Sequence, residues 1–411
     1  MARERIALRL RSAGIVLGGL LLTAAASAAA QSESGVPSSV GIVVSSSAPA
    51  SGIGAAILGQ GGNAVDAAVA TAFALAVTFP AAGNIGGGGF MLIRLRNGRA
   101  GLIDYRETAP ARATPAMYLR SDGSIDHELS TQGYLAVGVP GTVRGLALAH
   151  KRYGHLPWGT LIAPAAALAA NGFPVSEAMA RDLNRFLDQV FVRFGPSRAA
   201  YSKPGGGPWT AGDTLRLPDL ARALRDIARE GPDVFYRGWI ADSIAGQMAA
   251  NGGFVTKDDL AAYQAREREP VRGTFRGYDI LSAPPPSSGG TVLIELLKIL
   301  ERFDLKAAGR YSARTQHLSI EAMRRAYLDR ARWLGDPDFA LQPVARLTSR
   351  AYADSLARSI DVQRATPSVD LSPDLVCPPT EHLQTTHFSV VDREGNAVAN
   401  TYTLNWWYGS G

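Results

Sequence analysis

The stretch LQTTHFSVVDREGNAVANTYTLN, residues 383–405, decides the fold. A threonine pair beginning at Thr385 precedes residues 388–392, where apolar side chains alternate with others as in a half-buried strand. A short turn at 393–396 and a second run at 398–404 follow. The segment therefore predicts two neighbouring strands, the first of which opens with a hydroxyl side chain.

That hydroxyl has a specific chemical use if the peptide bond before Thr385 is cut. Thr385 would then carry a free α-amino group with an unperturbed pKa of about 7.7–8.0, so part of it is neutral at working pH and can take the hydroxyl proton. A lone threonine pair would need no such explanation, because threonine favours strands. The hypothesis of an N-terminal nucleophile therefore depends on the whole pattern as far as Asn405.

The pattern resembles the processing site of γ-glutamyltranspeptidases (glutathione hydrolases), TTHxSVVDxxGNAVAxTYTLN. GGNAVDAAVA at 61–70, AGNIGGGGFMLIR at 82–94 and PPPSSGG at 284–290 are also similar to that family. The resemblance implies that Thr385 is the nucleophile and that the Gln384–Thr385 bond is cut autocatalytically.

The resemblance also implies an α+β fold, the N-terminal nucleophile hydrolase αββα sandwich of two stacked, mainly antiparallel sheets between helix layers. The residues alone indicate only mixed α and β. We expect a large-subunit portion at 31–384 and the start of a small subunit at 385–411, both within one shared domain. Because most of a family-type small subunit would follow Gly411, we expect a truncated precursor whose sandwich is incomplete at the C-terminus.

Three further site residues are assigned by resemblance. Arg106, in the YRExAP motif after an expected strand, would hold the α-carboxylate of a γ-glutamyl group. An arginine at a strand end can grip a carboxylate with two prongs, although an ordinary ion pair is the common alternative. Thr403 would support the hydroxyl and amine of the nucleophile, and Asn405 would bind the α-amino end. Alone, each could equally serve packing or capping.

The resemblance implies a γ-glutamyltransferase and glutathione hydrolase that passes the γ-glutamyl group through a threonine ester to water, amino acids or peptides. No cofactor is needed. An acylase of the same family acting on glutaryl or β-lactam side chains, or on poly-γ-glutamate, is the nearest alternative. Trp406 and Trp407, where smaller or polar residues are expected, keep it open, although these indoles could equally pack the subunit interface. An unprocessed, inactive periplasmic binding protein is an alternative of another class.

Other candidate motifs are set aside. The glycines 86–89 lack the strand before and the helix after that a phosphate loop requires, so we expect them to permit close backbone approach. Ser287 and Ser288 lie in no GxSxG elbow and fit a turn. His387 can share the face of Thr385, but the free amine already supplies a base.

The first thirty residues read as a secretory signal, with four arginines before a short apolar run and small residues near Ala30. We therefore expect a periplasmic or secreted protein with no membrane attachment after signal removal. The formal net charge is +6, of which the signal supplies +3 from four Arg and one Glu, and no basic block suggests nucleic-acid binding. Cys377 is the only cysteine, and the six histidines show no metal-ligand spacing.

The remaining pattern supplies landmarks. Asn63 should cap a helix that is buried on all sides, and Asn97-Gly98 should close a hairpin. A strand pair is expected between 266–270 and 271–281. Residues 363–384 predict an exposed segment that ends at the scissile bond.

Overall fold

The two strands expected after Thr385 form the centre of a six-stranded antiparallel sheet. Strand β9 (Thr386–Asp392) pairs with β10 (Ala397–Thr403), with Thr386 opposite Tyr402 and Val391 opposite Ala397. Gly395 has a φ of 87°, which closes the turn, and the Asp392 carboxylate accepts hydrogen bonds from the backbone N–H groups of the turn. The hairpin prediction is confirmed.

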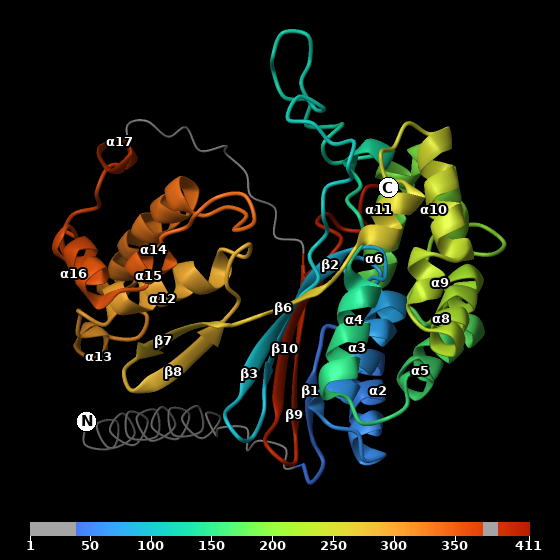
Figure 1. The fold of residues 1–411 in the computed structure, drawn as a ribbon, viewed down its shortest axis with the longest axis horizontal. Coiled ribbons are helices and arrows are strands. Elements are labelled where there is room, and N and C mark those ends of the chain that lie inside the picture. Colours follow the sequence, from blue (N-terminus) through green and yellow to red (C-terminus); the bar gives the residue numbers. More distant parts are fainter. Residues whose placement is uncertain (1–37, 373–384) are drawn as a thin grey trace, which may run out of the picture. The chain divides into compact units, whose positions relative to one another are not determined.

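The computed structural model describes residues 38–372 and 385–411, and Val40 onward belongs to one unit (Figure 1). The expected signal at 1–30, Cys377 and the cleavage-site residue Gln384 lie outside the described residues.

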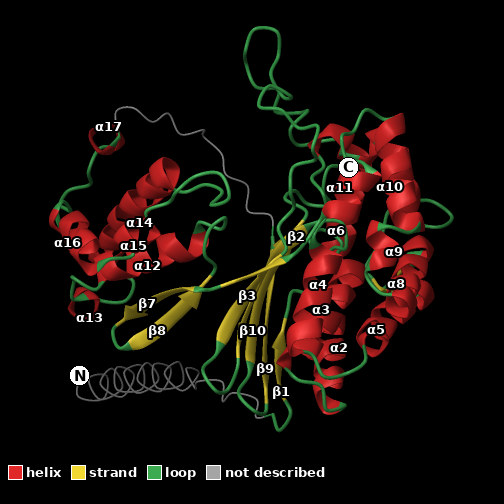
Figure 2. Cartoon of the chain, in the orientation of Figure 1, coloured by secondary structure: helices red, strands yellow, loops and turns green. Residues whose placement is uncertain are grey.

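The sheet has the order β1-β9-β10-β2-β3-β6, and every neighbouring pair is antiparallel (Figure 2). Its other four strands are β1 (Gly41–Val44), β2 (Gly88–Arg94), β3 (Ala100–Asp104) and β6 (Arg266–Arg268). Gly98 closes the β2–β3 hairpin with a φ of 84°, as expected. Strands far apart in the sequence are therefore neighbours, with β10 directly beside β2.

The prediction that 266–270 and 271–281 pair with each other is wrong. Strand β6 joins the six-stranded sheet beside β3, whereas β7 (Val271–Phe275) pairs with β8 (Tyr278–Ser282) in a separate hairpin. Pro270, which has no N–H to donate to a ladder, separates β6 from β7. The turn that joins β7 to β8 is closed by Arg276 and Gly277 with φ values of 49° and 86°.

Helices lie in layers on one side of the sheet, and the first three of them contact its strands directly (Figure 1). They are α2 (Ala48–Gly59), α3 (Ala64–Thr78), α4 (Thr142–Tyr153), α5 (Trp158–Asn171), α6 (Glu177–Gln189), α7 (Gly195–Tyr201), α8 (Pro218–Glu230), α9 (Asp233–Tyr236), α10 (Trp239–Ala250) and α11 (Lys257–Ala262). The short elements η1 (Tyr134–Ala136), β4 (Phe173–Pro174), η2 (Phe191–Arg193) and β5 (Thr214–Leu215) lie between them.

Helix α3 is the centre of the core. Asn63 and Asp66 form a reciprocal capping box at its start, and all of its residues are buried, as the apolar sequence predicts. It packs on β9 and β10, whose inward side chains include Phe388, Val390 and Tyr402. The segment that carries the expected nucleophile therefore rests on the best-buried helix of the fold.

The two faces of the sheet differ. Along β9, Phe388 and Val390 are buried whereas His387, Ser389 and Val391 are exposed. Within residues 38–372 and 385–411, no second large sheet covers the exposed face. The described residues thus contain one of the two sheets expected for the sandwich, with its helical layer.

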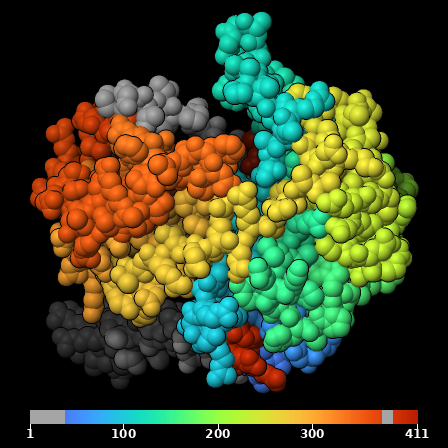
Figure 3. All heavy atoms as spheres, viewed as in Figure 1, coloured from blue at the N-terminus to red at the C-terminus, as the bar shows by residue number. Residues whose placement is uncertain are grey.

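A second group of helices gathers around the β7–β8 hairpin with a hydrophobic cluster of its own (Figures 1 and 3). It comprises α12 (Gly289–Leu300), α13 (Leu305–Ala308), α14 (Ala313–Trp333), α15 (Val344–Leu347), α16 (Arg350–Arg358) and α17 (Ser368–Leu371). The loop between β3 and α4 projects outward (Figure 3). Of the described helices, none combines the length and apolar character that crossing a membrane requires.

Candidate active site

The predicted site residues meet along one end of the sheet. The register places Thr386 opposite Tyr402 and Tyr402 opposite Gly89, and Gly89 exchanges backbone hydrogen bonds with Tyr105. The adjacent row therefore runs from Thr385 through Thr403 and Gly88 to Arg106. Thr403 and Gly88, which are 315 positions apart, become neighbours because the four strands meet at this end of the sheet.

Thr385 is exposed at the start of the row. Its Oγ donates a hydrogen bond to the carbonyl oxygen of Tyr402, at 3.3 Å. The next residue, Thr386, is buried, and its Oγ lies 3.0 Å from the Oγ of Ser46. The sheet thus presents one hydroxyl of the threonine pair to solvent and buries the other.

Thr403 and Asn405 lie at the end of the neighbouring strand. The Thr403 Oγ accepts a hydrogen bond from the Asn405 backbone N–H, at 3.0 Å. Asn405 has a φ of 69°, a left-handed conformation that asparagine tolerates better than most residues. This turn directs the chain away from the row directly after Thr403. Trp407, farther along, packs edge-to-face against Phe79 with ring centroids 6.1 Å apart.

The glycine-rich segment lies between the nucleophile strand pair and Arg106. A Cβ at Gly87 would overlap the Thr403 carbonyl oxygen, and a Cβ at Gly88 would lie 2.5 Å from the Tyr105 carbonyl oxygen. The Asn84 side chain fixes this segment, since its Oδ1 accepts from the N–H of Gly87 at 2.8 Å. The predicted close backbone approach is confirmed for Gly87, Gly88 and Gly89, whereas a Cβ at Gly86 would meet no atom within 4 Å.

Arg106 closes the row with an exposed guanidinium. Its Nη1 donates to the carbonyl oxygen of Pro286, at 3.4 Å, and its own carbonyl oxygen accepts from the Tyr263 hydroxyl, at 2.8 Å. Among residues 38–372 and 385–411 it forms no salt bridge. The ordinary ion pair that was the common alternative for this residue is therefore not formed.

The carboxylate of Asp104, two residues before Arg106, is already paired. Asp104, 7% exposed, accepts from Arg268 Nε at 2.6 Å and from the backbone N–H of Arg106 at 3.1 Å. The carboxylate thus positions the backbone of Arg106, while Arg268 balances its charge. The Arg106 guanidinium remains available for an anionic ligand.

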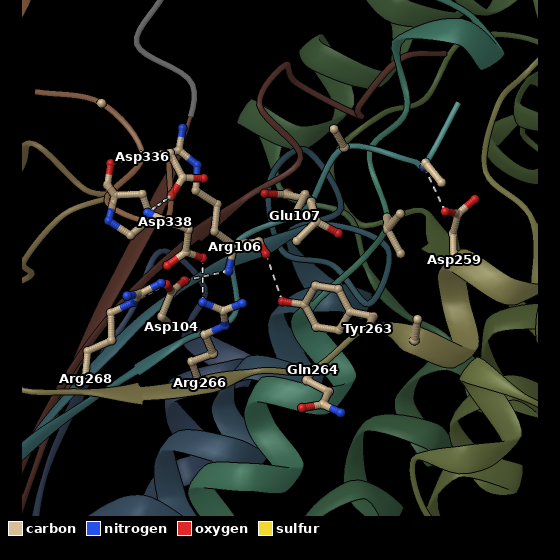
Figure 4. A pocket seen from close by; sticks show the side chains of 17 residues that line it. Asp104, Arg106, Glu107, Asp259, Tyr263, Gln264, Arg266, Arg268, Asp336 and Asp338 are labelled. Atoms are coloured by element: carbon tan, nitrogen blue, oxygen red, sulfur yellow. Dashed lines mark hydrogen bonds and ion pairs between the residues drawn. The ribbon is translucent and has the colours of Figure 1, made fainter. Parts of the chain in front are cut away.

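A cavity of about 690 Å³ opens beside Arg106 (Figure 4). Its charged and polar lining comes from β3, β6, α11 and the loop after α14: Asp104, Arg106, Glu107, Thr108, Asp259, Tyr263, Gln264, Arg266, Arg268, Asp336 and Asp338. Thr385 does not line it. The structure thus brings Arg106 and Thr385 to the same end of the sheet, but Thr385 lies outside this cavity.

Two residues of this region were missed by the sequence analysis. Glu107 lies against Gly88, and burial raises the pKa of its carboxyl group above the ordinary value. Tyr263, which bonds Arg106, also has a pKa raised by burial. Glu107 stands in the quoted YRExAP motif and could have been singled out there, whereas no sequence pattern connects Tyr263 with Arg106.

The spacing along the row limits the ligand. Neighbouring strands lie about 4.8 Å apart, so three steps place the backbones of Thr385 and Arg106 roughly 14 Å apart. The Arg106 side chain can extend across part of that distance. A ligand bound at both Arg106 and Thr385 would have to span the rest of that distance.

The residues set aside earlier have other partners. The ring nitrogens of His387 lie 2.7 Å from the Thr401 Oγ and 3.1 Å from the Ser389 Oγ. Ser288 Oγ accepts from Arg330 Nε at 3.0 Å, and Ser287 Oγ accepts from a backbone N–H of its own turn. In the part of the chain that is described, no cluster of three His, Cys, Asp or Glu residues could hold a metal ion.

The sequence of this chain is similar to those of known proteins. The family model described as gamma-glutamyltranspeptidase matches residues 50–411. The glutathione hydrolase proenzyme of Escherichia coli K12 is 50% identical over 371 residues, which cover 90% of this chain and 64% of that protein. The acylase ACY 1 proenzyme of Pseudomonas sp. strain SE83 is 40% identical, covering 90% of this chain and 66% of that protein.

A solved structure agrees with the fold. The Helicobacter pylori gamma-glutamyltranspeptidase matches with a TM-score of 0.80 and 44% identity, over 82% of this chain and 96% of that one. The fold class is thus that of the N-terminal nucleophile hydrolases, as expected. The chain spans slightly less than two thirds of the length of the curated relatives that it matches. Family model, relatives and fold agree, and the chain belongs to the γ-glutamyltranspeptidase family.

Proposed function

We propose that this chain belongs to a periplasmic or secreted γ-glutamyltransferase and glutathione hydrolase that cleaves itself before Thr385. The observation that carries the proposal is the row at one end of the sheet, which begins with an exposed threonine hydroxyl and closes with a guanidinium that forms no salt bridge within the described residues. Membership of the family adds the reaction class.

The first proposed step is self-cleavage. Thr385 Oγ attacks the carbonyl carbon of Gln384, the C–N bond breaks, and the hydroxyl proton passes to the departing nitrogen. Water then hydrolyses the resulting ester, which leaves a carboxylate on Gln384 and a free amine on Thr385. The products are a large subunit at 31–384 and a small subunit that begins at Thr385, held together as a heterodimer.

The second step uses the new amine as the base. The amine of Thr385 takes the hydroxyl proton, and Oγ attacks the γ-carbonyl of glutathione or another γ-glutamyl compound. The amine leaving group departs with a proton, and a γ-glutamyl ester remains. Water, or the amine of an amino acid or dipeptide, then takes the acyl group. In this scheme Arg106 binds the α-carboxylate, Asn405 the α-amino group, and Thr403 supports the nucleophile.

Intact mass measurement with N-terminal sequencing tests the proposal directly. We expect the purified protein to yield a second chain that begins at Thr385, and Thr385→Ala to remain uncut. Thr385→Ser, which keeps a hydroxyl nucleophile, is the matched control and should still be cut, more slowly. A single uncut wild-type chain would remove the self-processing enzyme and favour an inactive binding protein.

An acylase of the same family is the second candidate, favoured by the 40% identity to the acylase ACY 1 proenzyme. The two candidates differ in the donor, because a glutaryl amide lacks the α-amino group of a γ-glutamyl anilide. For the γ-glutamyltransferase we expect higher kcat/KM on the anilide, and Asn405→Ala should lower only that rate. Higher kcat/KM on glutaryl amides, unaffected by Asn405→Ala, would establish the acylase.

A further inference from the structure

Two buried carboxyl groups face each other in the second helix group. Glu295 of α12 is 0% exposed and Asp329 of α14 is 5% exposed, and the two interact side chain to side chain. The Tyr352 hydroxyl, from α16, donates to Asp329 Oδ2 at 2.8 Å. Three helices therefore meet around a pair of acidic groups that is shielded from water.

No donor satisfies Glu295. Among the described residues, neither of its carboxylate oxygens accepts a hydrogen bond from an N–H or O–H group. Two ionised carboxylates can only accept hydrogen bonds, so they would repel each other in a site of low dielectric. An uncompensated buried charge is far more costly than a protonated acid, which can donate to its neighbour.

The surrounding charges do not neutralise the pair. Lys298 Nζ bonds the Thr348 carbonyl, Arg330 bonds Ser288, and Arg346 stacks on the ring of Tyr352. Among the interactions that the structure records for the described residues, no salt bridge joins one of these cations to Glu295 or Asp329.

The acidic and basic groups farther out on these elements also have other surroundings. Glu301 of α12 pairs with Arg350, and Asp354 of α16 pairs with Arg302. On the β7–β8 hairpin, Arg272 and Asp279 are exposed. The pair must therefore lose its second charge by binding a proton.

We propose that Glu295 is protonated in the folded protein and donates to Asp329, and that this shared proton positions the 284–288 loop beside Arg106. Burial first, and then the contact with Asp329, raises the pKa of Glu295 to about 9, in agreement with that assignment. Glu295 is a positioning residue, since it acts through the loop and not on substrate.

The connection to the site runs through both helices. Helix α12 begins at Gly289, directly after the loop, and Pro286 of the loop accepts from Arg106 at 3.4 Å. Arg330, the residue after Asp329 on α14, donates to Ser288 at 3.0 Å. The contact of α12 with α14 thus fixes the loop that touches the proposed carboxylate-binding arginine. This connection rests on the proposed function, whereas the bound proton does not.

The proton makes stability depend on pH with a defined sign. Glu295 is protonated in the folded chain up to about pH 9 but ionises near its ordinary pKa of about 4.3 in the unfolded chain. Between these values the folded state holds one more proton, so its folding equilibrium constant falls about tenfold for each pH unit gained. The contribution of Glu295 to the free energy of unfolding is therefore fully present below its unfolded-state pKa and is lost as the pH rises toward 9.

Glu295→Gln tests the proton count, because glutamine keeps the shape and donates to Asp329 without titrating. We measure the folding equilibrium constant by urea unfolding between pH 5 and 9.5. In the wild type we expect Glu295 to contribute a tenfold fall in this constant for each pH unit. In Glu295→Gln that contribution should be absent, so the slope of the profile should be smaller by that amount. Glu177→Gln, which removes an exposed carboxylate on α6, is the control and should follow the wild type. Parallel wild-type and Glu295→Gln profiles would overturn the proposal.

A second variant keeps the test decisive if Glu295→Gln fails to fold. In Asp329→Asn the facing carboxylate becomes an amide that can donate to Glu295, so we expect the alkaline end of the stability loss to move down by at least one pH unit. If the pH at which the stability loss ends were the same in Asp329→Asn and the wild type, the result would contradict the shared proton.

The positioning role has its own readout. We expect KM for a γ-glutamyl anilide to rise at least threefold more in the wild type than in Glu295→Gln between pH 7 and 9.5. If the stability profiles differ as expected but KM depends on pH equally in the wild type and in Glu295→Gln, then Glu295 binds the proton without positioning the loop. An inactive protein that still shows the stability result would contradict only the proposed function.

Discussion

The two ends of the active-site row are built by different means. At the Thr385 end the backbone positions the chemistry: strand register sets Thr385 beside Thr403, and the glycine segment fits against carbonyl oxygens. At the Arg106 end side chains do so, through the Asp104–Arg268 ion pair and the Tyr263 hydroxyl.

The difference predicts two kinds of sensitivity. A backbone arrangement without free space cannot accommodate an added atom, so a substitution at the Thr385 end displaces the proposed nucleophile itself. A site built from side chains keeps its backbone when one group changes, so an error at the Arg106 end weakens ligand binding. The first kind of error should lower kcat and the second should raise KM.

Gly87→Ala should have the largest effect, because its Cβ would overlap the Thr403 carbonyl oxygen. Overpacking of this kind costs about 1–3 kcal/mol of stability, and a displacement of about 1 Å at a reacting group can cost roughly 100-fold in rate. We expect self-cleavage and kcat to fall by about that factor, measured by intact mass and steady-state kinetics.

Gly86→Ala is the matched control. A Cβ at Gly86 has no atom within 4 Å, so the same substitution one residue earlier should leave both measurements near wild type. Equal losses in the two variants would show that flexibility, and not close approach, explains the glycines.

Arg106→Lys should have an intermediate effect confined to KM. Lysine keeps the charge but loses the two-pronged geometry, and a hydrogen bond to a charged group contributes about 1.5–3 kcal/mol. We expect KM for a γ-glutamyl anilide to rise roughly 10- to 100-fold with kcat within a few-fold.

Arg266→Lys provides the comparison, since Arg266 lines the same cavity but pairs with Asp338 at the surface. Exposed ion pairs contribute about 0–1 kcal/mol, so KM should change little. If the two lysine variants behaved alike, the cavity as a whole, and not Arg106, would be the binding determinant.

What could be predicted from the sequence was encoded locally. The β9–β10 hairpin, the Asn63 capping box and the Gly98 turn each depend on residues a few positions apart, and each is confirmed. The roles of Thr385 and Arg106 came from motifs that resemble a family. The structure adds that Thr385 and Arg106 lie at the same end of the sheet.

What could not be predicted depends on contacts between distant segments. The pairing of β6 with β3 connects residues more than 160 positions apart, and hydrophobic alternation does not specify which strand is the partner. The bond from Tyr263 to Arg106 and the contact of Glu295 with Asp329 likewise join different elements. Glu295 and Asp329 lie on ordinary helical patterns, where nothing distinguishes a buried acid from a solvated one.

His387→Gln should have the smallest effect and would sharpen the assignment of the base. The ring is bonded to Thr401 and Ser389, and partial shielding from water lowers the pKa of this surface imidazole below its ordinary value, which favours the neutral form. If the amine of Thr385 is the base, kcat/KM should stay within about threefold of wild type, with an unchanged acid limb in its pH profile. Loss of a general base would instead lower kcat/KM about 100- to 10,000-fold.

Ser389→Ala, which removes only a partner of the ring, is the control. A loss confined to His387→Gln would transfer the base from the new chain end to the imidazole, and the backbone-built end of the row would then depend on a side chain after all.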